Sequence, residues 1–275
     1  MSLSEVSDTL RSIVKIALLS RRPDRAPVRH RGGRIIVMGN GPSLNDAIAN
    51  HADVIASTPS MAVNFAALSP ELSRLRPEYY VLADPHFFKD ADGPDDNRSK
   101  LRDAMNAVSW PMTLFVPVKY RKRATALYGG PMVTVRGFNA VGAEGFDCIV
   151  HRAYAAGLAM PRPRNVLIAA IMLAVGEGFD ELVVLGADHS WMKTLAVTDD
   201  NEVVSVQPHF YAESAHEEAR VRHEYRGYRL HDIVGSFAVA FRSYHQIERY
   251  ARRRGVRIIN ATPGSFIDAF ERGKL

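Results

Sequence analysis

The stretch "RIIVMGNGPSLND", residues 34–46, decides how the rest of the chain is interpreted. A short apolar run, typical of a buried strand, stops at a Gly-Asn-Gly-Pro-Ser turn, and a helical pattern begins directly after it. This arrangement often binds phosphate, because free backbone N–H groups and the helix dipole favour an anion. The spacing matches neither the lysine-containing triphosphate loop nor the three-glycine dinucleotide fingerprint. A tight turn before a capped helix, without a ligand, is the alternative.

The composition is that of a globular protein with a core of its own. The chain has 275 residues, of which 47% are hydrophobic and 24% are charged. Its net charge of +5 fits an anionic ligand or a membrane surface as well as nucleic acid. The basic residues stand in small groups without interleaved aromatic residues, so we expect no nucleic-acid partner.

The cysteine content and the N-terminal segment bear on localisation. Cys148 is the single cysteine, which excludes an intrachain disulfide and favours a reducing, cytoplasmic setting. The N-terminus does not resemble a signal peptide, because Lys15 interrupts its apolar run, and no stretch reaches the roughly 18 apolar residues of a membrane span. We assign residues 1–29 to an N-terminal helix and a basic linker. We expect this helix to pack on its own domain, with peripheral association with the inner membrane or contact with a partner as the alternatives.

Apolar runs of strand length recur through residues 30–275, which we assign to one nucleotide-binding α/β domain. Several runs are continuous rather than alternating, which favours strands buried on both faces of a parallel sheet. Helical patterns separate them, most clearly at 99–108, 166–175 and 233–254. The alternation predicts a Rossmann-like, doubly wound fold with a mainly parallel sheet of about seven strands. The predicted strands are 34–39, 53–58, 79–84, 112–118, 132–135, 181–188 and 256–262.

A polar segment rich in His, Tyr and Glu interrupts this rhythm at about residues 189–227. It carries no strong strand signal, and it leaves the predicted carboxyl end of a strand. Because long segments in that position usually cover an active site, we interpret it as a lid insertion.

Polar residues stand at several predicted strand ends. Ligands of open α/β sheets bind beyond the carboxyl ends of the strands, near the point where strand order reverses. After the first strand, the glycines would let backbone approach a ligand, Pro42 fixes a turn angle, and Ser43 is expected to cap the next helix. Asn40 can both donate and accept hydrogen bonds, which suits a ribose or a base edge. The other strand ends carry Asn64, Asp84, His86, Gly186, Asp188 and His189.

Two further motifs carry polar side chains. The segment "DPHFFKDADGPDD" at 84–96 holds an acidic cluster in a Gly-Pro loop, and we favour a solvated loop over a metal site. The segment "YRGYRLHD" at 225–232 precedes the predicted helix 233–254. His231 can be neutral at physiological pH and take a proton from a hydroxyl group. An ordinary surface histidine beside a helix cap is the alternative.

Four blocks of the sequence resemble the bacterial sialyltransferases that use CMP-activated sialic acid, and the glycosyltransferases grouped around them. The blocks are "IIVMGNGPSL", "SMAVNFAAL" through "YYVLADPHFF", "VLIAAIMLAVGEGFDELVVLGADHSW", and "GYRLHD" with "IINATPGSFIDAF". They cover much of residues 34–270, and the first is the most specific. The resemblance implies a Rossmann-like fold, a nucleotide-sugar donor, and a glycan or glycolipid acceptor.

The resemblance also implies which residues bind the nucleotide. Asn40, Gly41 and Asn64 would hold CMP and its phosphate. Gly186 and Asp188 match the stretch that recognises cytosine and ribose. The complete set is Asn40, Gly41, Pro42, Ser43, Asn64, Asp84, Arg164, Asn165, Gly186 and Asp188.

The family's general base, a histidine in a Tyr-x-x-His motif, falls on His231 with Tyr228 before it.

The chain departs from the family pattern at several other positions. Asp84 stands where the family has an asparagine, and Arg164 and Asn165 replace small hydroxyl residues. Two lid tyrosines that act on the leaving phosphate are not evident. The resemblance therefore supports the fold and the nucleotide more than it supports sialic acid, and it leaves open another CMP-linked sugar, such as a related nonulosonic acid or Kdo, or a different nucleotide.

We predict an inverting glycosyltransferase that needs no metal or cofactor beyond its CMP-activated donor. The alternative is a pyrophosphokinase related to the hydroxymethylpterin pyrophosphokinases, which the Asn-Gly-Pro-Ser-Leu turn also resembles. That reaction needs Mg²⁺, which Asp84, Asp188 and Asp90 would hold. A non-catalytic nucleotide-binding relative is the third reading, and homo-oligomerisation is left open.

Overall fold

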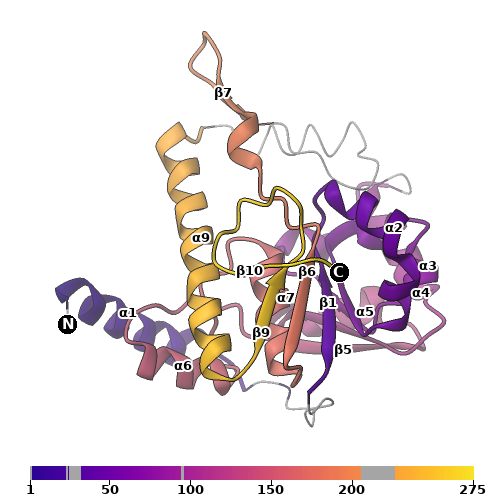
Figure 1. Cartoon of the computed structure of the whole chain (residues 1–275), viewed down its shortest axis with the longest axis horizontal. Coiled ribbons are helices and arrows are strands. Elements are labelled where there is room, and N and C mark those ends of the chain that lie inside the picture. Colours follow the sequence, from indigo (N-terminus) through magenta and orange to yellow (C-terminus); the bar gives the residue numbers. More distant parts are fainter. Residues whose placement is uncertain (1, 23, 25–31, 94–95, 206–226) are drawn as a thin grey trace.

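The structure is a computed structural model that describes residues 2–22, 24, 32–93, 96–205 and 227–275. Its centre is a parallel sheet of eight strands in the order β10-β9-β6-β1-β2-β3-β4-β5 (Figure 1). The chain winds outward from β1 through β5 on one side and returns through β6 to β10 on the other. The order therefore reverses between β1 and β6, as the predicted Rossmann-like fold requires.

The strands of this sheet agree with the sequence prediction at six of seven positions, and two strands were not predicted. Their bounds are β1 Arg34–Met38, β2 Ser60–Val63, β3 Tyr79–Val81, β4 Met112–Pro117, β5 Val133–Phe138, β6 Glu181–Leu185, β9 Arg257–Asn260 and β10 Glu271–Arg272.

The predicted strand at 53–58 is wrong, because this run belongs to helix α2, Ser43–Ser57. The buried residues of α2 recur at helical spacing, and Val54 in the same run is 44% exposed. A kink at His51 separates the run from the first turns of the helix. The strand that follows β1 in the chain is β2, whose four residues are all buried.

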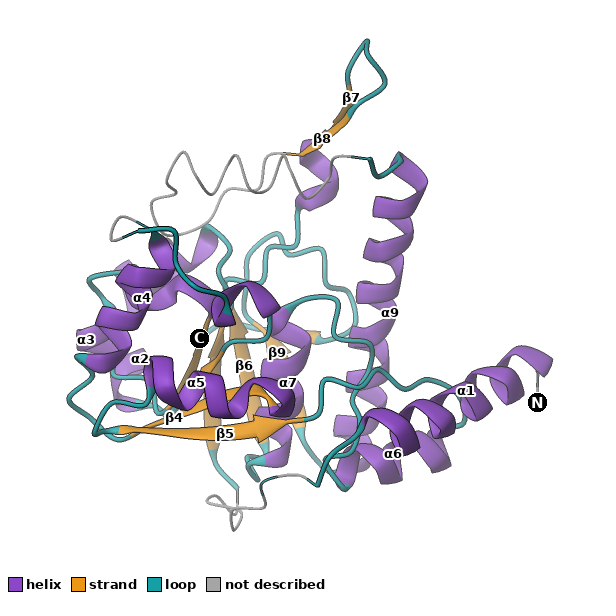
Figure 2. Ribbon diagram, turned by 180° about the vertical axis from the view of Figure 1, so that it is seen from behind, coloured by secondary structure: helices purple, strands orange, loops and turns teal. Residues whose placement is uncertain are grey.

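Helices cover both faces of the sheet (Figures 1 and 2). Alternate residues of β1 show why its apolar run is continuous: Ile35 and Val37 lie in the core on one face, while Ile36 and Met38 lie in the core on the other. The first core is closed by α6 (Asp147–Ala155), α7 (Val166–Gly176) and α9 (Leu230–Arg253). The second is closed by α2, α3 (Leu72–Leu75), α4 (Asn97–Asn106) and α5 (Arg121–Tyr128).

The segment predicted as a lid begins above the carboxyl ends of the strands (Figure 1). Its described part contains a short helix, η4 Trp191–Thr194, and a hairpin of β7 Leu195–Val197 with β8 Val203–Ser205. The sequence of this segment carries no strong strand signal and did not predict this hairpin. Most of the rest, residues 206–226, lies outside the described part of the chain.

Helix α1, Leu3–Leu19, is the predicted N-terminal helix. It begins at a capping box in which the Ser2 side chain accepts from the Glu5 N–H, and the Glu5 side chain accepts from the Ser2 N–H. As expected, it contacts its own domain, along α6 (Figure 2). None of the described helices is long and apolar enough to cross a membrane.

Candidate functional site

The turns after β1 and β6 interlock through their backbones. Gly39 donates its N–H to the Leu185 carbonyl at 2.7 Å, and Gly41 donates to the Gly186 carbonyl at 2.8 Å. A Cβ atom at Gly41 would overlap a carboxylate oxygen of Asp188, and one at Gly186 would lie 2.8 Å from the Gly39 carbonyl oxygen. Gly186 also has a φ of +61°, which glycine adopts without strain. These glycines are therefore required by contact between the two turns, a reason that the sequence did not reveal.

Asp188 occupies the N-terminal end of α2. Its Oδ2 accepts a hydrogen bond from the Ser43 hydroxyl at 2.7 Å. The expectation that Ser43 caps α2 is wrong, because the capping residue is Pro42 and its side chain makes no capping bond. The carboxylate instead places a negative charge beside the positive end of the helix dipole. A phosphate at the same point would meet that charge.

Asn40 and Asn64 carry buried polar atoms without hydrogen-bond partners. Both side-chain polar atoms of Asn40 and the Oδ1 of Asn64 are in this state among the described residues. Strands β1 and β2 are parallel neighbours with Ile36 opposite Ser60, so Asn40 and Asn64 both follow the carboxyl ends of adjacent strands. An unsatisfied buried amide is costly, so these groups are suited to hydrogen bonds from a ligand.

Asn64 also has a strained backbone. Its φ of +52° lies in the left-handed region, and its carbonyl oxygen accepts a hydrogen bond from the Tyr80 hydroxyl at 2.6 Å. Asparagine tolerates this conformation better than most residues, and such strain often marks a functional site. We call the residues Asn40, Gly41, Ser43, Asn64, Gly186 and Asp188 the strand-end cluster.

Three other predicted nucleotide-binding residues lie apart or are already engaged. Asp84 is exposed and caps a short helix, η2 Pro85–Phe88, by accepting from the His86 N–H at 2.7 Å. Arg164 is exposed. Asn165 caps α7, because its Oδ1 accepts from the Ile168 N–H at 3.1 Å.

Asn165 is part of a polar network that also holds His189 and Tyr244. The Tyr244 hydroxyl donates to the Asn165 Oδ1 at 3.0 Å and lies 2.6 Å from the His189 Nε2. The Asn165 Nδ2 lies 3.4 Å from the same His189 Nε2, so the tyrosine hydroxyl and the amide group both contact this ring nitrogen.

Burial keeps this imidazole neutral. His189 is 8% exposed, and its burial lowers its pKa to about 3. Its φ of +50° is a second left-handed backbone at a strand end, one residue after Asp188. The Trp191 ring lies against it with 4.2 Å between ring centroids, and Trp191 also contacts Phe237 of α9. The start of the lid segment is thus fixed to α9 through side chains.

The predicted catalytic pair is on the surface. His231 is 82% exposed in its side chain and lies 3.4 Å from the Asp232 carboxylate, at the beginning of α9. Tyr228 is 57% exposed. In the part of the chain that the structure describes, no contact joins either residue to the strand-end cluster. The beginning of α9 does lie on the side of the sheet toward which the strands run (Figure 1).

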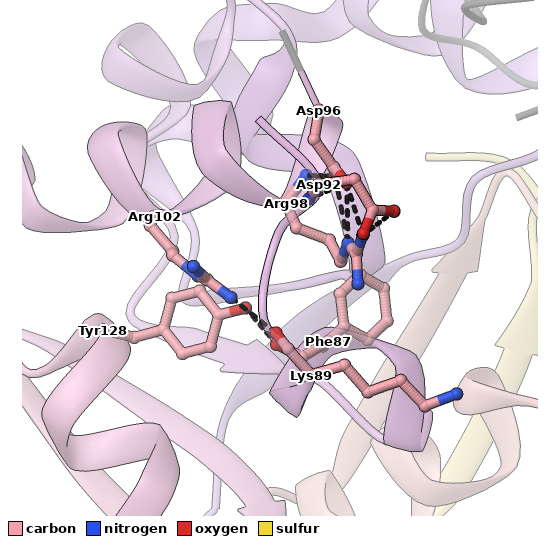
Figure 3. Close-up of polar contacts among 7 residues, drawn as sticks. All are labelled: Phe87, Lys89, Asp92, Asp96, Arg98, Arg102 and Tyr128. Atoms are coloured by element: carbon pink, nitrogen blue, oxygen red, sulfur yellow. Dashed lines mark hydrogen bonds and ion pairs between the residues drawn. The ribbon is translucent and has the colours of Figure 1, made fainter. Parts of the chain in front are cut away.

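The acidic loop at 84–96 is held by ion pairs (Figure 3). The Arg98 guanidinium is nearly buried and contacts Asp92 at 2.8 Å and Asp96 at 2.5 Å. Hydrogen bonds from Arg98 lower the pKa of Asp96 far below its ordinary value. Asp90 pairs with Arg123. The prediction of a solvated loop fits Asp90 and Asp92, whose side chains are 90% and 73% exposed, but not Asp96, whose side chain is 8% exposed against Arg98.

No group of three or more His, Cys, Asp and Glu side chains with metal-binding geometry is found among the described residues. The three carboxylates that the pyrophosphokinase alternative requires belong to different arrangements: Asp188 is bonded to Ser43, Asp90 to Arg123, and Asp84 to the backbone of η2.

Together, the sheet order and the polar strand ends define a doubly wound, Rossmann-like α/β protein. A solved structure with this fold is the MAf glycosyltransferase from Magnetospirillum magneticum AMB-1, which matches with a TM-score of 0.50 at 13% sequence identity. The match covers 98% of this chain but 38% of the glycosyltransferase, so the chain spans well under half of that protein's length. At this identity the likeness shows the fold.

Sequence comparisons add no family to this likeness. No family model matches the chain, and no curated protein is similar to it in sequence. The resemblance to sialyltransferases drawn from the four motif blocks therefore stays a prediction beyond the level of fold.

Proposed function

We propose that the protein is a glycosyltransferase that transfers sialic acid, or a related nonulosonic acid, from a CMP-activated donor to a hydroxyl group of a glycan or glycolipid. The observation that carries the proposal is the pair of unsatisfied amides, Asn40 and Asn64, at the strand ends. They lie beside the reversal of strand order, where open α/β sheets bind nucleotides. The fold shared with a glycosyltransferase supports the same reaction class.

The charge of Asp188 suggests how the donor lies. A carboxylate at the beginning of α2 would repel a phosphate there, but it can accept hydrogen bonds from ribose hydroxyls or from the amino group of cytosine. The nucleoside would then lie beyond the carboxyl ends of β1 and β6, beside the Asp188 carboxylate. The phosphate would lie toward β2, where Asn64 supplies the next amide. This orientation needs no metal ligand from the strand-end cluster.

His231 is the proposed general base. It would take the proton of the acceptor hydroxyl while that oxygen bonds to the anomeric carbon and the bond from that carbon to the CMP phosphate oxygen breaks. CMP leaves with the electron pair of that bond, so the anomeric configuration inverts. The exposed imidazole of His231 is accessible to an acceptor as large as a glycan. Tyr228, three residues earlier, is 57% exposed and would also contact the acceptor.

Turnover of CMP-sialic acid with a mixture of glycan acceptors tests the base. We expect His231→Ala to abolish transfer while the dissociation constant for CMP stays within a few fold. His245→Ala is the matched control, because this histidine lies on the same helix, is half-exposed and pairs with Asp268. Unchanged transfer by His231→Ala would remove His231 from the mechanism.

A titration with ADP and Mg²⁺ tests the reaction class. Glycosyl transfer predicts that CMP binds with EDTA present and that ADP with Mg²⁺ does not compete. Binding of ADP that depends on Mg²⁺, without binding of CMP, would favour pyrophosphoryl transfer instead. Binding of CMP without hydrolysis or transfer of any CMP-sugar would indicate a non-catalytic relative.

A further inference from the structure

Tyr80 bonds from β3 to the turn that follows the neighbouring strand β2. It lies opposite Ala62 of β2, and both side chains belong to the core that α2 closes. The tyrosine is fully buried. Its hydroxyl group reaches η1, Asn64–Leu68, the short helix that begins directly after β2. A core side chain of one strand therefore contacts the carboxyl end of the next.

The Tyr80 hydroxyl bonds to two backbone groups of the same turn. It donates to the Asn64 carbonyl at 2.6 Å and accepts from the Ala67 N–H at 2.8 Å. In an ordinary 3₁₀ turn, the carbonyl of residue i accepts from the N–H of residue i+3, so these two groups would bond to each other. The shape of this turn therefore depends on a hydroxyl group supplied by β3.

The turn contains a backbone conformation that needs such support. Asn64 has a φ of +52°, and strain of this kind persists only where the surrounding structure fixes it. The next residue, Phe65, is 3% exposed, and its ring lies 5.0 Å from the Phe87 ring between centroids. The Tyr80 bond and the buried Phe65 ring thus fix the backbone on the C-terminal side of Asn64.

The side chain of Asn64 is what this conformation directs. Glycine would adopt the same φ without strain, but it has no side chain to present. The Asn64 amide is joined to the backbone through a single carbon atom, so its direction follows the backbone closely. Its Oδ1 is buried without a hydrogen-bond partner, since Tyr80 bonds to the carbonyl and not to the amide. The amide is therefore fixed in direction and still available to a ligand.

We propose that Tyr80 is a positioning residue for the nucleotide site. By holding Asn64 in the left-handed conformation, it directs the Asn64 amide toward a ligand at the strand-end cluster. Tyr80 does not touch the ligand, because it is fully buried and its hydroxyl bonds to Asn64 and Ala67. This inference rests on the proposed nucleotide site, and it adds to that site a residue of β3.

Calorimetric titration of the full chain with CMP tests the role of the hydroxyl group. Tyr80→Phe keeps the buried ring and removes the hydroxyl, so we expect the dissociation constant for CMP to rise at least about fivefold. Tyr154→Phe is the matched control, because Tyr154 is buried in the core on the opposite face and donates to the Ala143 carbonyl at 2.5 Å. It loses a comparable hydrogen bond, and its dissociation constant should stay within about twofold of wild type.

A double-mutant cycle with Asn64→Gly separates positioning from general support of the fold. Glycine retains the left-handed backbone and removes the amide, so Asn64→Gly alone should also weaken CMP binding at least about fivefold. In the Asn64→Gly background, Tyr80→Phe should change the dissociation constant by less than about twofold, because the group that it positions is gone. A structural role alone would weaken binding by the same factor in both backgrounds.

The outcomes distinguish this inference from the proposed function. Wild-type protein that does not bind CMP would refute the proposed function, and the positioning role with it. Wild-type binding that Tyr80→Phe leaves unchanged would overturn the positioning role alone. So would CMP binding that Asn64→Gly leaves unchanged, or equal effects of Tyr80→Phe with and without the Asn64 side chain.

Discussion

Replacing Asn40 with alanine should separate stability from ligand binding. Asn40 stands after β1, and neither of its side-chain polar atoms has a hydrogen-bond partner. Asn260, the last residue of β9, is the matched control at another strand end. Its Nδ2 donates to the Ser265 hydroxyl at 2.9 Å and to the Ile267 carbonyl at 3.3 Å, and its Oδ1 accepts from the Thr262 N–H at 3.1 Å.

The two substitutions should have different effects on the free energy of unfolding. Each of the three hydrogen bonds of Asn260 contributes about 0.5–1.5 kcal/mol, so Asn260→Ala should lower the free energy of unfolding by about 2–4 kcal/mol. Asn40→Ala removes no hydrogen bond, and it relieves the desolvation cost of an unpaired amide, which is about 1–3 kcal/mol. Lost packing offsets that gain, so stability should change by less than about 1 kcal/mol in either direction.

The effect on ligand binding should be the reverse. A ligand that satisfies the Asn40 amide loses at least one hydrogen bond in Asn40→Ala, which corresponds to about a tenfold weaker dissociation constant for CMP. The Asn260 side chain is buried and its polar atoms are bonded within the protein, so it cannot bind CMP directly, and the affinity for CMP should fall less in that variant than in Asn40→Ala, measured below its unfolding midpoint.

Urea unfolding followed by circular dichroism gives the stability of each variant, and calorimetric titration gives its affinity for CMP. Equal destabilisation by Asn40→Ala and Asn260→Ala would show that the Asn40 amide is satisfied within the protein. Unchanged CMP affinity in Asn40→Ala would place the ligand elsewhere.

Three other predictions concern the residues around the strand-end cluster. Gly41→Ala should destabilise the fold by about 1–3 kcal/mol in urea unfolding, because the new methyl group overlaps the Asp188 carboxylate. The control Gly235→Ala, in open space on α9, should be neutral or stabilising. Equal effects of the two substitutions would contradict the close contact between the turns after β1 and β6. Tyr244→Phe should cost about 1–3 kcal/mol by removing the hydroxyl group that bonds to the His189 Nε2 and the Asn165 Oδ1, and an unchanged thermal midpoint would exclude these bonds. Burial lowers the pKa of His189 from 6.5 to about 3, so between these pH values the unfolded chain binds more protons than the folded chain. The free energy of unfolding should therefore fall as the pH drops from 7. His189→Gln should flatten this dependence when unfolding is measured at pH 5, 6 and 7.

The sequence was sufficient for the central strands. The run at 34–38 is continuous because its side chains enter cores on both faces, and a parallel sheet is what such runs predict. The run at 53–58 was ambiguous, since a short apolar run fits a strand or one side of a helix equally well. Its spacing from Leu44 and Ile48, at multiples of about 3.6 residues, was the signal for the helix.

The candidate site was only partly predictable. Asn40, Asn64 and Asp188 follow strands directly, so the topology brings them to one edge, and local sequence sufficed to find them. The network of Asn165, His189 and Tyr244 joins residues up to 79 positions apart, and its only local sign is the histidine after Asp188. The two glycine turns show the same limit, because a contact between distant backbones leaves no trace in either turn alone.

The orientation of α1 could not be read from its apolar pattern. Periodicity gives the angular position of the leucines, but not which side meets the domain. Hydroxyl groups of Thr9 and Ser12 bond to the backbone of 144–146, and these specific contacts outweigh burial of the apolar side.

Calorimetric titration of the full chain with CMP, with EDTA present, most directly tests whether the strand ends form a nucleotide site. We expect saturable binding to one site per chain, weakened at least about tenfold by Asn40→Ala and unchanged by His245→Ala. Absence of CMP binding, together with Mg²⁺-dependent binding of ADP, would show that the site serves a different nucleotide and a different reaction.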